Sequence, residues 1–161
     1  MTKILAIDPG PTKSAILLWD GVRPSHMAII PNADILRGVH EYARAYPETL
    51  LAIEMIASYG MPVGAEVFST CLWIGRFIEK WVTFTCLPEP QLIPRGDIKL
   101  HLCRSLRAKD ANVRQALIDR FGAPGTKKAP GALYGVTSHC WAALALAVCA
   151  FDRLKVEEAA A

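Results

Sequence analysis

The sequence lacks an apolar run long enough to cross a membrane. Its longest, residues 142–151, ends at Asp152 and Arg153 after about half of the roughly 20 residues that a spanning helix needs. No basic segment with a following apolar core and cleavage site opens the chain, so we expect no secretory signal. Internal repeats and interdomain linkers are also missing. We therefore predict a cytoplasmic protein with one domain over residues 1–161 and no membrane partner.

Cysteine pairs with metal-site spacing are absent as well. The five cysteines are Cys71, Cys86, Cys103, Cys140 and Cys149, and no two of them form a C-x-x-C pair. Most lie within apolar helical or strand patterns, which predicts buried, reduced thiols in a reducing compartment. This pattern argues against a structural zinc site.

A large net charge is missing too, but the charge is unevenly distributed. The chain has 52% hydrophobic residues and a net charge of +3, which excludes a disordered chain. Residues 95–128 contain nine Lys/Arg and three Asp, a balance of +6, while the rest has nine basic and twelve acidic residues, a balance of −3. One basic segment on a mildly acidic body is typical of a protein that binds a polyanion. The alternative is a set of solvated helix faces that happen to be basic.

Short apolar runs separated by turn residues dominate the first third of the chain. They predict strands at Ile4–Ile7, Ser14–Gly21, Arg23–Ile30 and Leu50–Ile53. A helix with Asn32 as its N-cap lies between the last two of these strands and ends at Pro47. The first three strands form an antiparallel meander.

Helical patterns dominate the rest of the chain. We predict a helix at Glu66–Trp81, a fifth strand at Val82–Leu87, helices at Ile98–Leu106 and Ala111–Phe121, and a last helix from Thr137 or Ser138 to about Leu154. Asp97 and Asp110 are interpreted as helix caps. The element order predicts an α/β fold with a mixed five-stranded sheet and helices on both faces.

The predicted helix at Glu66–Trp81 is apolar over a wide arc. One stripe contains Val67, Cys71, Ile74, Ile78 and Trp81, and further large apolar residues lie beside it. This surface is broader than one contact with a sheet requires. We expect a second buried contact there, with another copy of the chain.

Two carboxylates follow directly after buried strands. Asp8 precedes Pro9-Gly10, and Glu54 closes the fourth strand. If the two strands are neighbours, the carboxylates meet at one end of the sheet, where they need a cation between them. Oxygen ligands of this kind suit Mg²⁺ or Mn²⁺. The alternatives are a backbone cap for Asp8 and a salt bridge for Glu54.

These motifs together resemble the RuvC-type Holliday-junction endonucleases of the ribonuclease H-like superfamily. The resemblance rests on Ile7-Asp8-Pro9-Gly10 before the meander, Ile53-Glu54 after the next strand, and Ala143-Leu-Ala-Leu-Ala-Val148 in the last helix. It implies a homodimer that cleaves four-way DNA junctions by metal-dependent phosphodiester hydrolysis. Asp8 and Glu54 match the family's first two acidic metal ligands.

The last helix departs from the family pattern. The family carries two ligands three residues apart there, and the match places them at His139 and Ala142. The resemblance therefore implies a metal site of Asp8, Glu54 and His139 that is one carboxylate short. Asp97, Asp110 and Asp152 are other acidic residues that could replace the missing ligand. Asp97 and Asp110 are better explained as helix caps, and Asp152 lies several helical turns from His139, so we expect none of them in the site.

The DNA-binding residues are predicted from the basic segment and from the resemblance. Lys99 lies near the sequence position at which the family carries a basic residue. The resemblance therefore implies that Lys99 contacts the scissile phosphate during catalysis. Tyr59, in the loop after Glu54, matches an aromatic residue that stacks on the junction. The predicted DNA-binding set is Tyr59, Arg95, Lys99, Arg104, Arg107, Lys109, Arg114, Lys127 and Lys128. For Lys99, Lys127 and Lys128 the alternative is a solvated lysine, and for Tyr59 it is a core position.

Three further interpretations stay open. The gap at Ala142 is compatible with a protein that binds branched DNA and cleaves it weakly or not at all. The same residues would serve a phage-type nuclease that acts on other branched DNA. Asp8-Pro-Gly-Pro-Thr12 also resembles the phosphate loop of actin-like ATPases, but this chain has no second Gly-rich phosphate motif.

Overall fold

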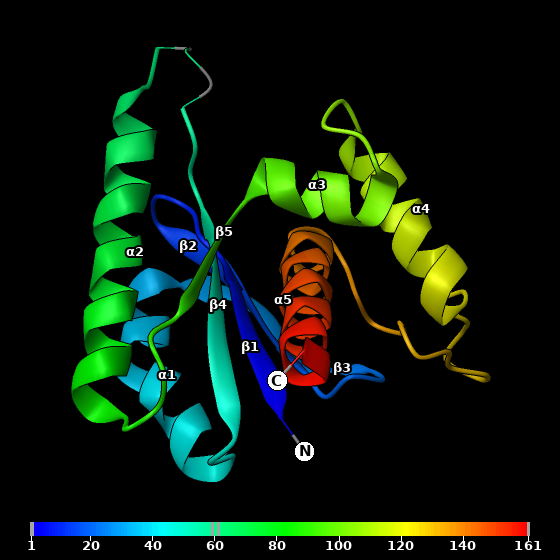
Figure 1. Ribbon diagram of the computed structural model, residues 1–161, viewed down its shortest axis with the longest axis horizontal. Coiled ribbons are helices and arrows are strands. Elements are labelled where there is room, and N and C mark those ends of the chain that lie inside the picture. The colour runs from blue at the N-terminus through cyan, green and yellow to red at the C-terminus, as the bar shows by residue number, and fades with distance from the viewer. Residues whose placement is uncertain (1, 59, 61, 161) are drawn as a thin grey trace.

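A five-stranded mixed sheet forms the centre of the computed structural model, which describes residues 2–58, 60 and 62–160 (Figure 1). The strands are β1 (Lys3–Asp8), β2 (Lys13–Trp19), β3 (Pro24–Pro31), β4 (Thr49–Met55) and β5 (Gln91–Pro94), in the order β3-β2-β1-β4-β5. β1, β2 and β3 are antiparallel, whereas β4 and β5 run parallel to β1. The predicted α/β fold with a mixed five-stranded sheet and an opening meander is confirmed.

The helices lie on both faces of this sheet (Figure 1). They are α1 (Asn32–Ala45), α2 (Ala65–Phe84), α3 (Arg95–Cys103), α4 (Asp110–Phe121) and α5 (Cys140–Ala160). α1 and α2 cover one face, and α5 covers the other with α3 and α4 beyond it. The first eleven residues of α5 are apolar all round, and all of them except Ala142 are buried. They contact the sheet on one side and α3 and α4 on the other.

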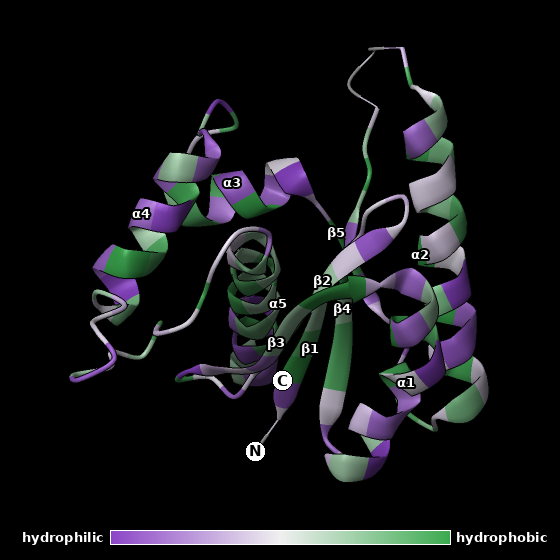
Figure 2. Ribbon diagram, turned by 180° about the vertical axis from the view of Figure 1, so that it is seen from behind, coloured by the Kyte–Doolittle hydropathy of each residue, from purple (hydrophilic) through white to green (hydrophobic). Residues whose placement is uncertain are grey.

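Alternation along the strands assigns each side chain to one of these faces. In β1, Leu5 and Ile7 pack toward α1 and α2, while Ile4 and Ala6 pack toward α5. The same alternation holds in β4. Figure 2 shows the central strands as hydrophobic along most of their length, whereas α4 alternates between hydrophobic and hydrophilic residues. The sheet is thus buried on both faces, as expected for its parallel part.

The predicted fifth strand is wrong. Residues 82–84 continue α2, and the edge strand is β5, which begins at Gln91, after the end of the predicted strand. Val82 and Phe84 have high strand propensity, but Phe77 and Trp81 are fully buried in the helix that precedes them. Packing of the helix against the sheet therefore outweighs the local propensity.

The buried face of α2 also differs in part from the predicted stripe. Thr70, Ile74, Phe77 and Trp81 are buried, whereas Cys71 is exposed. Phe68 and Leu72 remain 60% and 71% exposed, so a wide apolar surface is left uncovered. Cys86 is exposed too, and only Cys140 and Cys149 are buried, so the prediction of mostly buried thiols is wrong. All five thiols are free.

Three residues interpreted as helix caps do not cap. Asn32 is the first residue of α1, and its buried side chain bonds to the loop after β1. Asp97 pairs with Arg153 at 3.0 Å. Asp110 lies in the first turn of α4, which has no side-chain cap of the expected kind. These acidic and amide groups use long-range partners that local sequence does not reveal.

Across the described ranges, no helix has the length and apolar character that a membrane crossing requires.

Candidate active site

The sheet register brings Asp8 and Glu54 side by side. β1 and β4 are parallel neighbours, and Ile7 pairs with Ile53, so the next residue of each strand is a carboxylate. By alternation both side chains continue the face that α5 covers. The carboxylates are 16% and 17% exposed. The strands are neighbours, which is the condition under which the sequence pattern brings the two carboxylates together.

The loop after β1 turns sharply to allow this arrangement. A Cβ atom on Gly10 would lie 2.4 Å from the carbonyl oxygen of Lys13, so only glycine fits at this position. The backbone N–H of Gly10 donates a hydrogen bond to Ser14 Oγ at 3.1 Å. Asp8 is thereby left at the open end of the strand, with its side chain free of the turn.

Burial makes both carboxylates reluctant to ionise. It raises the pKa of Glu54 to about 7, against the opposing effect of the nearby Arg95 guanidinium, and the Asp8 charge adds to the increase. Burial also raises the pKa of Asp8, and His139 and Arg95 oppose that shift. Two such groups require positive charge nearby to be ionised together. A cation beside the pair would lower the pKa of both groups.

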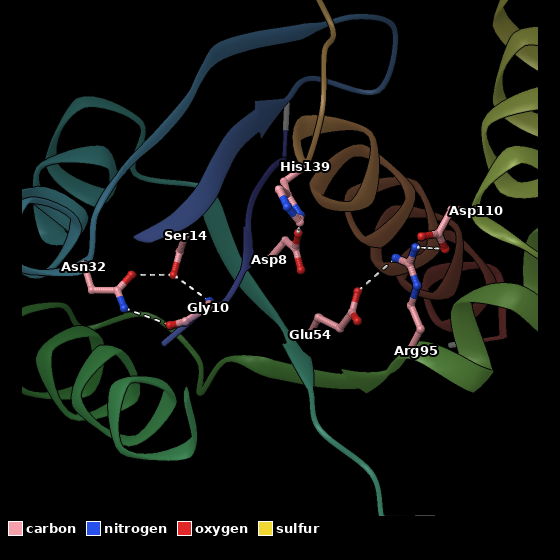
Figure 3. A network of polar contacts seen from close by, with 8 residues as sticks. All are labelled: Asp8, Gly10, Ser14, Asn32, Glu54, Arg95, Asp110 and His139. Carbon is pink, nitrogen blue, oxygen red and sulfur yellow. Dashed lines mark hydrogen bonds and ion pairs between the residues drawn. The ribbon is translucent and has the colours of Figure 1, made fainter. Parts of the chain in front are cut away.

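His139 joins Asp8 from a segment distant in sequence. It lies in the turn just before α5, and its Nδ1 is 3.3 Å from Asp8 Oδ2 (Figure 3). Its side chain is 71% exposed. The preceding residue, Ser138, has a φ of +46° and so turns the chain toward the strand ends. The imidazole is therefore held at the rim of the carboxylate pair and open to solvent.

Arg95 and Asp110 extend the site on its other side. Arg95 is the first residue of α3, directly after β5, and its guanidinium contacts two carboxylates (Figure 3). Nη1 lies 3.1 Å from Glu54 Oε2, and Nη2 lies 2.6 Å from Asp110 Oδ1. Sequence reasoning assigned Arg95 to DNA binding and Asp110 to a cap, and it missed this bridge. No local signal could have found it, because the three residues come from β4, α3 and α4.

A cavity of about 240 Å³ opens beside His139. Arg95, Asp110, Arg114 and Ala142 contribute to its lining. Ala142, which the resemblance in sequence motifs places at a ligand position of the family, thus faces a space already lined by a carboxylate from α4. A larger groove of about 640 Å³ lies between α1 and α2 on the other face of the sheet, away from these groups.

The chemistry of the donor set fits a small divalent cation. Two buried carboxylates and one imidazole are ligands that Mg²⁺ or Mn²⁺ accepts. Within residues 2–58, 60 and 62–160, however, no three His, Cys, Asp or Glu side chains are close enough together to hold a metal ion. In this arrangement Glu54 is bonded to Arg95 instead.

The predicted DNA-binding cations divide into two groups. Arg95 is paired internally, and Lys99 is half-buried in a hollow lined by Arg95, Gly96 and Leu106. Arg104, Arg107, Lys109, Arg114, Lys127 and Lys128 are exposed. Arg114 also stacks over the ring of Trp141, with 4.7 Å between its Cζ and the ring centroid. Tyr59 lies outside the described residues.

The remaining acidic candidate, Asp152, lies elsewhere. Its carboxylate accepts hydrogen bonds from Arg120, at 2.5 and 2.7 Å, and lies 2.7 Å from His101 Nε2. These contacts tie α5 to α3 and α4. Asp152 therefore has a structural role, as its distance along the last helix predicts.

The chain matches no protein-family model and no curated protein sequence. It is similar, however, to solved structures of RuvC from Thermus thermophilus. One has a TM-score of 0.71 at 19% identity, with 96% of each chain covered. Another, of the same organism's RuvC in complex with a Holliday junction substrate, has a TM-score of 0.68 at 17% identity and covers 96% of this chain and 97% of that one. The chain therefore has a RuvC-type fold, as the sequence motifs predict.

Proposed function

We propose that this protein is a metal-dependent endodeoxyribonuclease that binds and cleaves four-way DNA junctions. The observation that carries the proposal is the pair of buried carboxylates, Asp8 and Glu54, on neighbouring strands with His139 against Asp8. This constellation occurs in a RuvC-type fold, and one similar structure holds a Holliday junction substrate.

Asp8, Glu54 and His139 are the residues that would hold Mg²⁺ or Mn²⁺. When bound, such an ion lowers the pKa of a water molecule and stabilises the charge that develops on the phosphate. Asp8 lies between the other two ligands and is suited to sharing its oxygens. With Ala142 in place of a further ligand, a second ion would be held weakly.

The exposed cations of the segment between α3 and α4, of α4 and of the loop after it would contact DNA phosphates. Lys99 lies beside Arg95 at the edge of the site, where its ammonium group would neutralise the scissile phosphate. Tyr59 would stack on bases at the branch point. Binding through Arg104, Arg107, Lys109, Arg114, Lys127 and Lys128 predicts an affinity that falls steeply with salt.

Two symmetric incisions require two sites in one particle, so we propose a homodimer. Support comes from the uncovered apolar residues of α2, Phe68 and Leu72, and from the groove that α2 forms with α1. A second copy of α2 would cover this surface through a two-fold axis. Sedimentation at micromolar concentration tests it, and Leu72→Glu should shift the protein toward the monomer.

The decisive experiment compares four-way, three-way, flap and linear duplex DNA in Mg²⁺ and in EDTA. We expect metal-dependent cleavage with preference for the four-way junction. Tight junction binding without cleavage would instead indicate a binding protein, and equal cleavage of all branched substrates would indicate a broader nuclease. The Ala142→Asp variant tests the missing ligand, and we expect it to raise the cleavage rate by about tenfold. An unchanged rate would mean that the gap does not limit activity.

A further inference from the structure

Arg95 places a cation of the protein itself where the proposed metal site needs one. Its guanidinium is 24% exposed and lies against Glu54, which is 17% exposed. The backbone around it is well anchored, because Pro94 ends β5 and Ile93 pairs with Glu54 in the sheet. Arg95 is therefore fixed by the same register that fixes its partner.

This arrangement conflicts with metal binding at Glu54. The Arg95 Nη1 group donates to Glu54 Oε2 at 3.1 Å, so one of the two carboxylate oxygens of Glu54 is already used. A divalent ion beside Asp8 and Glu54 would also be repelled by the guanidinium at close range. Metal binding at Glu54 thus competes with the Arg95 contact.

Asp110 provides the guanidinium with a second acceptor. Arg95 Nη2 donates to Asp110 Oδ1 at 2.6 Å, and the Asp110 side chain is 82% exposed. Asp110 lies in the first turn of α4, where the helix dipole stabilises a negative charge. The flat, forked guanidinium can keep this bond after it releases Glu54, which a lysine ammonium could not do as well.

We propose that Arg95 is a positioning residue that bonds to Glu54 in the metal-free protein, and that it releases Glu54 and keeps its bond to Asp110 when a divalent cation binds Glu54. This inference rests on the proposed function, since it takes Asp8, Glu54 and His139 as the metal site. The same movement frees guanidinium N–H groups beside the metal site, where a DNA phosphate would meet them. Arg95 thereby couples metal entry to phosphate binding.

Arg95 lies in the proposed site but should weaken metal binding, because it competes with the metal for Glu54. Arg95→Gln removes a competing hydrogen bond and a repelling charge, so it should tighten Mn²⁺ binding by about tenfold. Arg95→Lys keeps the charge without the fork and should give an intermediate affinity. We would measure the loss of the free Mn²⁺ signal by electron paramagnetic resonance at pH 8, without DNA, after confirming the fold by thermal melting.

Arg23→Gln is the matched control. It makes the same change of charge at an exposed position in the turn between β2 and β3, at the opposite end of the sheet. Its Mn²⁺ affinity should equal that of the unmodified protein. Adding Glu54→Gln to Arg95→Gln should remove the gain.

Asp110→Asn separates a partner of Arg95 from a metal ligand. If Asp110 acts through Arg95, the substitution weakens Mn²⁺ binding about threefold in the unmodified protein and has no effect beside Arg95→Gln. Weakening in both backgrounds would show that Asp110 itself is a ligand and would overturn its role as the acceptor.

The outcomes also distinguish this inference from the proposed function. One outcome is that the unmodified protein binds Mn²⁺, that Asp8→Asn does not, and that Arg95→Gln binds Mn²⁺ no more tightly than the unmodified protein. In that case the Arg95 inference is wrong and the nuclease proposal stands. If neither the unmodified protein nor Arg95→Gln binds Mn²⁺, both fail.

Discussion

Two polar networks lie at the same end of the sheet, one on each side of β1, and they are built differently (Figure 3). The first links Gly10, Ser14 and Asn32. Ser14 Oγ donates to Asn32 Oδ1 at 2.6 Å, and Asn32 Nδ2 donates to the carbonyl of Gly10 at 2.9 Å. Its members are neutral, and Ser14 and Asn32 are 2% and 0% exposed.

The second network contains Asp8, Glu54, Arg95, Asp110 and His139. It is charged, opens to solvent at its rim, and holds two carboxylates whose pKa values burial raises. Its hydrogen bonds leave carboxylate oxygens of Asp8 and Glu54 without a donor from the protein among the described residues.

The difference teaches what each network is for. A buried neutral network whose groups satisfy one another rigidifies the fold. A partly buried charged network with unsatisfied carboxylate oxygens reduces stability and is typical of functional sites. The Ser14–Asn32 network fixes the loop after β1, and the Asp8–Glu54 network is the one that the proposed function uses.

The largest expected effect is on cleavage. Asp8→Asn or Glu54→Gln should lower the rate of junction cleavage by about 10³-fold, because each removes a charge that the metal requires. Junction affinity should change little, since carboxylates repel phosphate. Gel-shift and cleavage assays on the same preparation test this. A collapse of binding would show that these residues are not a metal site.

The next effect is on stability, at the neutral network. Asn32→Ala leaves the Ser14 O–H without its acceptor and the Gly10 carbonyl without its side-chain donor, and should lower the free energy of unfolding by about 3 kcal/mol. Urea denaturation measures it, with Gln115→Ala on the exposed face of α4 as the control. A loss as small as that of the control would remove the contrast between the two networks.

Glu54→Gln should have the opposite effect on stability, and only at high pH. The pKa of Glu54 is about 7 in the folded protein against an ordinary value of 4.5. The folded state therefore binds more protons between these values, and stability falls as pH rises through them. We expect the metal-free variant to gain about 2 kcal/mol above pH 7 and nothing below pH 4.5.

Thermal melting from pH 4 to pH 9 tests this dependence. Glu89→Gln changes an exposed carboxylate. Its melting temperature relative to the unmodified protein should not show the gain at high pH that is expected for Glu54→Gln. A constant gain for Glu54→Gln at every pH would mean that burial of its charge is not the cause.

The smallest effects are expected outside both networks. Arg107→Gln or Lys109→Gln should weaken junction binding about threefold each and reduce the salt slope by about one. Fluorescence anisotropy at several salt concentrations measures this, with Arg23→Gln as the control. An unchanged slope would remove these residues from the DNA-binding surface.

Local patterns were reliable where packing agreed with them. The runs at Ile4–Ile7 and Leu50–Ile53 are buried strands because apolar residues of this kind fit a sheet that is covered on both faces. The strand prediction was wrong at residues 82–84 because they continue the helix in which Trp81 is buried, so that tertiary packing overrides strand propensity. The prediction that Cys71 is buried was wrong because the buried face of α2 is centred on Phe77, which only the fold reveals.

The sequence by itself determined the two strand-end carboxylates and the meander, and the resemblance placed His139 at a ligand position of the last helix. These follow from strand alternation, turn chemistry and a resemblance that order and spacing carry. Only the tertiary structure brought Arg95 between Glu54 and Asp110. Ion pairs form between whichever charged ends the packed elements bring together, and neither the 41 residues from Glu54 to Arg95 nor the 15 from Arg95 to Asp110 encode that meeting locally.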